Sequence, residues 1–318
     1  MKLKLILLLS ILLFIVACVS EAPEPATEQV NLEPTPESGR STEVLPSEVP
    51  EILPPEVQAE EPSTLDDWHY QLQDATFSSV RELQTAYVIV DIDDIDLSAE
   101  QLGVLHQQGK TIFSYLSIGE AEDYREYWQD GWRVGSPSFI DAENPGWEGN
   151  FKVKYWDLGW QEIILAKVEM IAEQGYDGVY LDIIDAYEYY EEQGRETAAQ
   201  EMIDFVRKIR EASQQINPSF LIVPQNAAEL YTFEEYRQII DGFGKEDTWF
   251  DDDEEISDDS SLSFLDQAVR DGKFVLAVDY PTIEKKICEF YKECNSHGFY
   301  CTVSDRDLDL SEPIFCGD

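Results

Sequence analysis

The sequence predicts an α/β fold: a (β/α)8 TIM barrel built from residues 66–318, preceded by a lipoprotein signal peptide (1–18) and a disordered, acidic, Pro-rich linker (19–65). Three observations lead to this prediction. Eight apolar, β-rich runs alternate with helical patterns. Residues 66–318 give an ordinary length for one barrel. Polar residues collect where the apolar runs end, which is where such barrels carry their functional groups.

The first 18 residues are a targeting segment. Lys2 and Lys4 form a short basic region, and Leu5 to Val16 is almost wholly apolar but too short to span a bilayer comfortably. Ala17 directly before Cys18 is typical of a lipoprotein signal-peptidase site, and an ordinary signal peptide with a chance cysteine is the alternative. We therefore expect an exported cell-surface lipoprotein, anchored to the membrane through acyl chains on Cys18.

Residues 19–65 differ sharply in composition from the rest of the chain. They contain nine prolines and eleven glutamates against a single basic residue, Arg40, and no aromatic residue. Such a segment cannot bury enough apolar surface to offset the entropy lost on ordering. We expect a disordered, self-repelling tether.

Residues 66–318 show the alternation of strands and helices. Helical patterns between the strands cover 98–108, 158–174, 196–215, 262–270 and 283–293, several with a serine start or a glycine stop. The strands are expected at 68–72, 87–92, 111–118, 178–184, 220–225, 240–244, 273–278 and 299–303. An open doubly wound sheet is the alternative, but no G-x-G-x-x-G motif follows a strand.

The longest insertion follows the third strand, at about 122–157. It carries Trp128, Trp132, Trp147 and Trp156. We expect this insertion to be ordered and to shape a cleft.

The chain is strongly acidic, with 66 Asp and Glu against 22 Lys and Arg and a formal net charge of −44. Phosphate-bearing partners would be repelled, so neither nucleic acid nor an anionic membrane surface is expected as a binding partner. A high-salt habitat or a cationic substrate could each explain the charge, and the shared bias of the linker favours the habitat.

Four cysteines lie near the C-terminus: Cys288, Cys294, Cys301 and Cys316. In an exported protein an even cluster predicts two disulfides, and three pairings are possible. A zinc site is the rival hypothesis, but there is no C-x-x-C pair and His297 is the only nearby histidine. The bridges would tie the C-terminal tail to the last helix and strand.

Carboxylates and aromatic rings gather at the ends of the predicted strands. Only three histidines occur in the chain, so neither a Ser-His-Asp triad nor a histidine metal cluster is supported. Carboxylates with aromatic rings suit glycoside cleavage, because one carboxyl protonates the leaving oxygen while a second attacks the sugar or activates water. The candidates are Trp68, Tyr70, Asp91, Tyr115, Glu120, Asp182, Asp185, Asn226, Glu246 and Tyr280.

Several of these candidates also have structural interpretations. Asp185 could begin a helix as its N-cap, and some aspartates of 91–96 could cap the helix near Ser98. Glu120 could bind substrate or pair with Arg125. Asp182 has the weakest structural interpretation because it directly ends the most apolar strand. No D-x-[DN]-x-[DN]-G loop supports calcium.

Five segments, in order, give the chain a resemblance to a known family. They are YLSIGEAEDYREYW (115–128), VKYWD (153–157), GYDGVYLDIIDAY (175–187), QN with AAEL (225–230) and DGFGKE (241–246). They resemble glycoside hydrolase family 114, the endo-α-1,4-polygalactosaminidase-like proteins, over essentially all of 66–305. The resemblance implies a (β/α)8 barrel that cleaves a galactosamine-containing polysaccharide with retention of configuration.

Carried over by motif, the family's catalytic carboxylates correspond to Asp182 and Glu246. We favour Asp182 as nucleophile and Glu246 as acid/base. The resemblance also implies cleft-lining roles for Tyr115, Glu120, Tyr124, Asp185, Asn226 and Tyr280. Two features depart from the family: the acidic tract 251–255 directly after Glu246, and the C-terminal cysteines.

The sequence as a whole therefore predicts a membrane-tethered extracellular glycoside hydrolase that acts without a metal or cofactor and is a monomer. Its expected partner is an α-1,4-linked amino-sugar polymer. Two alternatives remain open: a non-catalytic carbohydrate-binding lipoprotein with the same barrel, and a hydrolase of another cell-surface glycan.

Overall fold

A computed structural model describes residues 68–257 and 260–317. The predicted signal peptide, Cys18 and the linker 19–65 lie outside the described residues. Within the described part of the chain, no helix is long and apolar enough to cross a bilayer.

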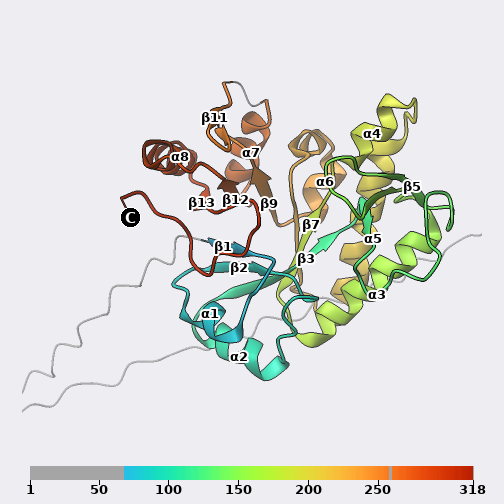
Figure 1. The fold of residues 1–318 in the computed structure, drawn as a ribbon, viewed down its shortest axis with the longest axis horizontal. Helices are drawn as coiled ribbons and strands as arrows, with labels where there is room; N and C mark the ends of the chain where they lie inside the picture. Colours follow the sequence, from blue (N-terminus) through green and yellow to red (C-terminus); the bar gives the residue numbers. More distant parts are fainter. Residues whose placement is uncertain (1–67, 258–259, 318) are drawn as a thin grey trace, which may run out of the picture. The chain divides into compact units, whose positions relative to one another are not determined.

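The core of the domain is a set of parallel strands, and all eight predicted strands are present. Their order is β1-β2-β3-β7-β8 in one sheet and β13-β12-β9 in a second. A parallel bridge between Gln225 and Gly244 joins β8 to β9, and β1 contacts β13, so the arrangement is TIM-barrel-like (Figure 1). The strands are β1 (Trp68–Gln71), β2 (Tyr87–Val90), β3 (Thr111–Ser117), β7 (Gly178–Asp182), β8 (Leu221–Pro224), β9 (Gly242–Glu246), β12 (Phe274–Asp279) and β13 (Tyr300–Val303).

Helices lie around the outside of these strands (Figure 1). The five predicted helices are confirmed: α2 (Ala99–Gln107), α3 (Leu158–Gln174), α5 (Ala198–Ile216), α7 (Leu262–Arg270) and α8 (Glu284–Ser296). Four short ones were not predicted, because five to seven residues hold too little periodicity. They are α1 (Phe77–Glu82), α4 (Ala186–Glu192), the 3₁₀-helix η1 (Ala228–Thr232) and α6 (Glu234–Ile239).

The start of α2 corrects one expectation. Ser98 accepts a hydrogen bond from the backbone N–H of Gln101, and the side chain of Gln101 accepts one from the backbone N–H of Ser98. This capping box leaves no role for the preceding aspartates at the helix start, so the idea that some of them cap α2 is wrong. Asp94 instead accepts hydrogen bonds from the backbone N–H groups of Asp74 and Ala75.

The insertion after β3 is ordered, as predicted, and forms a small antiparallel sheet. The strands β4 (Glu120–Glu122), β5 (Ile140–Glu143) and β6 (Asn150–Val153) pair in the order β4-β6-β5. Trp128 packs against Trp132 and Phe151, with ring centroids 5.4 Å and 4.9 Å away. A second two-stranded unit, β10 (Phe250–Asp251) with β11 (Glu254–Glu255), lies in the acidic tract.

Aromatic side chains fill the inside of the parallel strands. Trp68 and Tyr70 lie on the same, inward face of β1, and their ring centroids are 5.6 Å apart. The ring centroid of Tyr180 of β7 lies 5.2 Å from that of Tyr70. The indole N–H of Trp68 donates to the carbonyl of Ala277, and the ring is fully buried. These rings form a solid layer below the strand ends.

The ring of Tyr180 passes directly over Gly244 of β9. A Cβ atom placed on Gly244 would lie 2.0 Å from the Tyr180 hydroxyl oxygen. Non-bonded contacts of this length do not occur in folded proteins. Any side chain at position 244 would therefore displace the Tyr180 ring from its present position.

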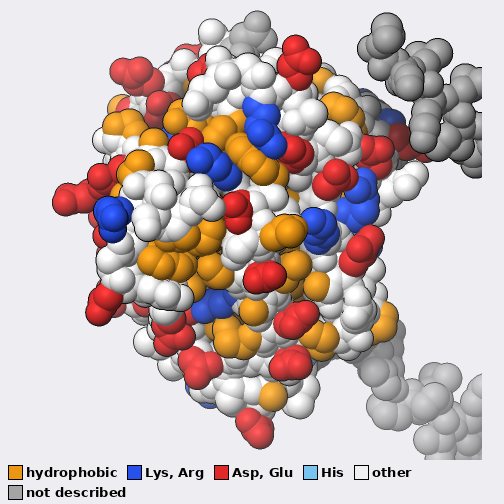
Figure 2. Space-filling view, turned by 90° about the vertical axis from the view of Figure 1, so that its right-hand side faces the viewer, with side chains coloured by type: hydrophobic (Ala, Val, Ile, Leu, Met, Phe, Trp, Pro, Cys, Tyr) orange, Lys and Arg blue, Asp and Glu red, His pale blue; other side chains and the backbone are white. Residues whose placement is uncertain are grey.

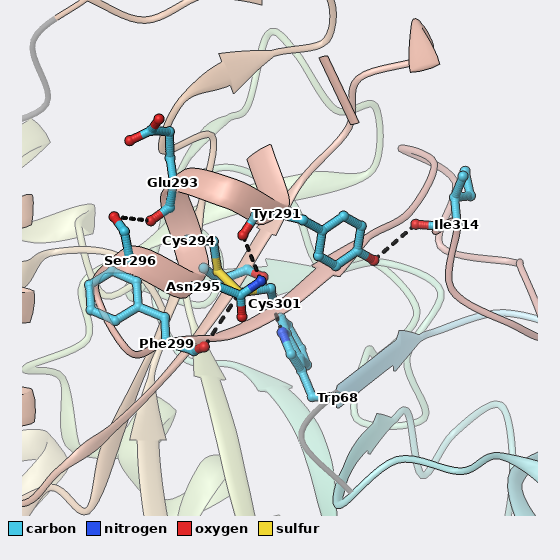
Figure 3. The surroundings of a disulfide bond; sticks show 10 residues. Trp68, Tyr291, Glu293, Cys294, Asn295, Ser296, Phe299, Cys301 and Ile314 are labelled. Carbon is cyan, nitrogen blue, oxygen red and sulfur yellow. Dashed lines mark hydrogen bonds between the residues drawn. A yellow bond between two sulfur atoms is a disulfide. The ribbon is translucent and has the colours of Figure 1, made fainter. Parts of the chain in front are cut away.

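Two disulfides link residues of the C-terminal region, and the structure shows which of the three possible pairings they adopt. Cys288 of α8 bonds Cys316 in the tail, and Cys294 of α8 bonds Cys301 of β13 (Figure 3). The hydroxyl of Tyr291 also donates to the carbonyl of Ile314. The tail is thus tied to the last helix as predicted, and the rival zinc hypothesis is wrong because all four sulfurs are bonded in pairs.

Acidic side chains are dispersed over the face that Figure 2 shows, the side on which α3, α4 and β5 lie in Figure 1. Lys and Arg side chains lie between them. On this face the acidic side chains are spread out and do not form a single stripe.

The Tyr180–Gly244 contact predicts the effect of adding one methyl group. We expect Gly244→Ala to lower the free energy of unfolding by about 1–3 kcal/mol, because the rigid, buried ring cannot move aside without overpacking the barrel interior. Urea unfolding followed by circular dichroism measures this.

Gly103→Ala is the matched control. Gly103 lies within α2, and a Cβ there meets nothing within 4 Å. We expect this change to raise stability by roughly 0.5–1 kcal/mol, since alanine is the better helix former. Equal stability of Gly244→Ala and the unmodified protein would contradict the packing argument.

Candidate active site

A cavity of about 700 Å³ lies at the carboxyl ends of the strands. Its lining comes from the ends of β1, β2, β3, β7, β8, β9 and β12, from the insertion and from the segment after β13. Ten of the eleven predicted catalytic and substrate-binding residues line it: Tyr70, Asp91, Tyr115, Glu120, Tyr124, Asp182, Asp185, Asn226, Glu246 and Tyr280. Trp68 is the exception. It is buried in the aromatic layer and does not reach the cavity, so its assignment to substrate binding is wrong.

Asp182 ends β7 and is held by two hydrogen bonds. The Tyr115 hydroxyl donates to its Oδ2 atom over 2.7 Å, and the backbone N–H of Ile183 donates to its Oδ1 atom over 2.7 Å. Burial, followed by the charge of Glu246, raises the pKa of Asp182 to about 8, although the two hydrogen bonds act in the opposite direction. Because Glu246 also has a raised pKa, the two carboxyl groups together can hold one proton near neutral pH.

Glu246 ends β9 in a comparable setting. The Tyr280 hydroxyl donates to its Oε1 atom, and its backbone N–H donates to the side-chain oxygen of Asn226 over 3.3 Å. Burial raises the pKa of Glu246, opposed by the hydrogen bond from Tyr280. Each of the two residues is thus half-buried, and each carboxyl group accepts a hydrogen bond from one tyrosine.

The strand order explains why the two carboxyl groups share one cavity. β7 and β9 lie on either side of β8, so their backbones are on the order of 10 Å apart. Tyr180 and Gly244 each lie two residues before the carboxylate of their strand, on the same inward face. Since Tyr180 contacts Gly244, the two strand ends are held in register directly below the carboxyl groups.

Arg125 organises the opposite wall. Its guanidinium contacts Asp91 at 2.5 Å, Glu122 at 2.7 Å and Asp93 at 3.1 Å. Asp91 lies in this network beside the cavity, and it is buried together with the arginine.

Glu120 does not pair with Arg125, so that alternative is wrong. Its carboxylate lies 3.4 Å from the Lys152 ammonium and accepts a hydrogen bond of 2.9 Å from the Asn144 amide. Both partners belong to the insertion, and the antiparallel pairing of β4 with β6 brings Lys152 opposite Glu120.

Asp185 stands at the N-cap position directly before α4 but makes no side-chain capping bond. The residue is exposed and lines the cavity instead. The structure therefore does not support the helix-cap interpretation of Asp185.

Sequence reasoning missed several cavity residues. Trp147 lies in the insertion and is 63% exposed at the cavity, much like Tyr124 at 64%. Its signal was present, because it is one of four tryptophans in a segment expected to shape a cleft. Arg306 follows β13, beyond the end of the family resemblance, and only the rule that every loop after a barrel strand faces the site could have indicated it.

No group of three or more His, Cys, Asp or Glu side chains placed to hold a metal ion is found within residues 68–257 and 260–317.

Comparison with protein families matches residues 53–317 to the glycoside hydrolase family GH114. An uncharacterized protein of Methanocaldococcus jannaschii is 35% identical over 265 residues, covering 76% of this chain and 77% of that protein. An uncharacterized protein of Thermotoga maritima is 32% identical over 267 residues, covering 78% and 83%.

Two solved structures share the fold. The glycoside hydrolase domain of PelA from Pseudomonas aeruginosa has a TM-score of 0.61 at 19% identity, covering 77% of this chain and 97% of that chain. Aspergillus fumigatus Ega3 in complex with galactosamine has a TM-score of 0.60 at 18% identity, covering 79% and 94%. Because the family match spans most of the chain and includes the strands that carry Asp182 and Glu246, this protein belongs to glycoside hydrolase family GH114.

Proposed function

We propose that this protein cleaves within an α-1,4-linked, galactosamine-containing polysaccharide, with Asp182 and Glu246 as its catalytic pair. One observation carries the proposal: two half-buried carboxyl groups from separate strands, both with raised pKa, line a single cavity large enough for sugar rings. The fold shared with Ega3, whose structure contains galactosamine, supports the substrate class.

The proposed chemistry needs one ionised and one protonated carboxyl group. The Asp182 carboxylate attacks the anomeric carbon while Glu246 gives its proton to the departing glycosidic oxygen, and the C–O bond breaks. Water then attacks the glycosyl–Asp182 ester and gives a proton to Glu246, which releases the sugar with its original configuration. The two hydrogen bonds to Asp182 stabilise its negative charge, which supports the nucleophile role.

The walls of the cavity suit an amino-sugar polymer. The exposed rings of Trp147 and Tyr124 offer flat faces for sugar rings. Asp185 makes no side-chain capping bond and can receive a sugar ammonium group in the cavity.

We further propose that the enzyme works at the cell surface, exported and tethered by an acylated Cys18 and the linker 19–65. This rests on the sequence of residues 1–65 alone.

Asp182→Asn and Glu246→Gln should each lower kcat on a galactosamine polymer by roughly 10²–10⁴-fold or more, because each removes one partner of the proton and bond exchange. New reducing ends measure cleavage, and circular dichroism checks folding. Asp204→Asn, on the outside of α5, and the exposed Glu82→Gln are the matched controls and should keep full activity.

Full activity in either cavity variant would contradict the assignment. Polymer binding by the unmodified protein without new ends would favour a carbohydrate-binding role, and cleavage of a different glycan would change the substrate. In the same digestion, proton NMR of the first product shows α-anomers if configuration is retained and β-anomers if it is inverted.

Cleavage should also depend on pH in a defined way. Since burial and the charge of Glu246 raise the pKa of Asp182 to about 8, the pair holds one proton up to about that pH. We expect kcat/KM to fall as pH rises through about 8, where the last proton leaves and no acid remains. An alkaline limit near pH 4 to 5, typical of an exposed carboxyl group, would contradict the buried-pair argument.

The anchoring proposal has its own test. Cys18→Ser removes the acylated sulfur, so metabolic labelling with an alkyne-bearing fatty acid should be lost and the protein should leave the detergent phase. Cys288→Ser, which removes a different cysteine, is the control and should keep the label. Labelling of Cys18→Ser would contradict the lipoprotein assignment.

A further inference from the structure

Arg306 is held by three carboxylates of the acidic segment after β9. Its Nη2 atom lies 2.8 Å from Asp247 and 2.6 Å from Asp251, and its Nε atom lies 2.8 Å from Asp252. Its Nη1 atom makes a second contact with Asp247 at 3.0 Å. Such a multiple contact fixes both the position and the plane of the guanidinium.

The same guanidinium covers the ring of Tyr280. Its central carbon lies 4.2 Å from the ring centroid, within the range of a cation–π contact. The hydroxyl of that ring donates to the carboxylate of Glu246. Three separate segments therefore form one row of contacts: Arg306 after β13, Tyr280 after β12 and Glu246 at the end of β9.

The carboxylates that hold Arg306 are themselves held in place. The buried carboxylate of Asp279 accepts hydrogen bonds of 2.8 Å from the backbone N–H groups of Thr248, Trp249 and Phe250. Asp253 accepts from the backbone N–H groups of Thr282 and Ile283 at the start of α8. The acidic segment is thus attached to the barrel on both sides of the arginine contacts.

The opposite side of the cavity repeats this arrangement. Arg125 lies 5.9 Å from the ring of Tyr115, whose hydroxyl donates to Asp182. It too contacts three carboxylates. The side chain of Arg125 is only 9% exposed, whereas that of Arg306 is 37% exposed. Arg306 is the more accessible member, and its removal disturbs the core less.

We propose that Arg306 is a positioning residue for the reaction: it holds the Tyr280 phenol against Glu246 and places a positive charge beside that carboxyl group. The proposal rests on the proposed role of Glu246. Arg306 acts through Tyr280. It is held by Asp247 and by Asp251 and Asp252, the first two residues of the acidic tract 251–255 that departs from the family pattern.

The charge of Arg306 suits a group that must change its protonation during each cycle. Glu246 gives up its proton in the first step and must accept one from water in the second, so its ionised form must be attainable in a buried site. Arg306 and Lys245 favour that form, and Asp247 opposes it. The other titratable groups that face Glu246 are Asp182 and Tyr180 from β7, Tyr70 from β1, and Tyr280.

Removing Arg306 takes away the cation and leaves Asp247, which already opposes the ionisation of Glu246, without its arginine partner. Both effects favour the protonated form. In Arg306→Gln we therefore expect the Glu246 titration to move upward by on the order of one pH unit. Arg306→Lys keeps the charge but not the planar, multiple contact, so a smaller upward shift is expected.

The experiment uses the full chain in detergent, labelled with [5-¹³C]glutamate, with the Glu246 signal assigned by its loss in Glu246→Gln. Carboxyl shifts are followed against pH for the unmodified protein, both Arg306 variants and Arg207→Gln. Arg207 pairs with Asp204 on the outside of α5, so this control removes the same charge far from the cavity. The control should leave the Glu246 titration unchanged.

An unchanged Glu246 titration in folded Arg306→Gln, or the same shift in Arg207→Gln, would overturn the proposal. If the polymer is cleaved, the limb of the kcat/KM profile that belongs to Glu246 should move with the NMR titration and kcat should fall more than KM rises. If the unmodified protein cleaves no polymer, the proposed function fails, while the titration still decides the role of Arg306.

Discussion

The partial burial of two carboxyl groups in one cavity is the constraint on which the rest of the site depends. Asp182 and Glu246 end strands that flank β8, and the Tyr180 ring resting on Gly244 holds those strands together just below them. In water each carboxyl group would ionise independently. Here burial raises the pKa of both, and the charge of Glu246 raises that of Asp182 further. A site that keeps one proton on a pair is suited to acid-assisted bond cleavage.

Tyrosine and arginine side chains stabilise the two carboxyl groups in this environment. A phenol donates to each carboxyl group, and an arginine held by three carboxylates lies against each phenol. The arginines are thereby fixed by more negative charge than they carry. The chain has a net charge of −44 and few basic side chains, yet one arginine lies beside the tyrosine partner of each of the two carboxyl groups.

Two segments outside the repeating strands and helices complete the cavity. The three-stranded insertion supplies Glu120, Trp147 and the lysine that faces Glu120. The segment after β13 supplies Arg306. One disulfide ties the tail to α8, and the other ties β13 to α8 (the second is drawn in Figure 3), so this end of the chain stays attached. Both segments carry side chains that the alternation of strands and helices alone does not indicate.

The sequence by itself determined the eight strands, the five longer helices, the presence of two disulfides and the two carboxylates at the ends of β7 and β9. These depend on local signals: the period of apolar residues, glycine and serine at helix ends, and a charged residue where a buried run stops. Only the tertiary structure decided that Trp68 fills the interior, that Glu120 faces Lys152 rather than Arg125, that Asp185 caps nothing, and how the cysteines pair. Each of those outcomes depends on which segments meet when the strands come together, and side-chain contacts across strands leave no trace in the order of residues along one strand.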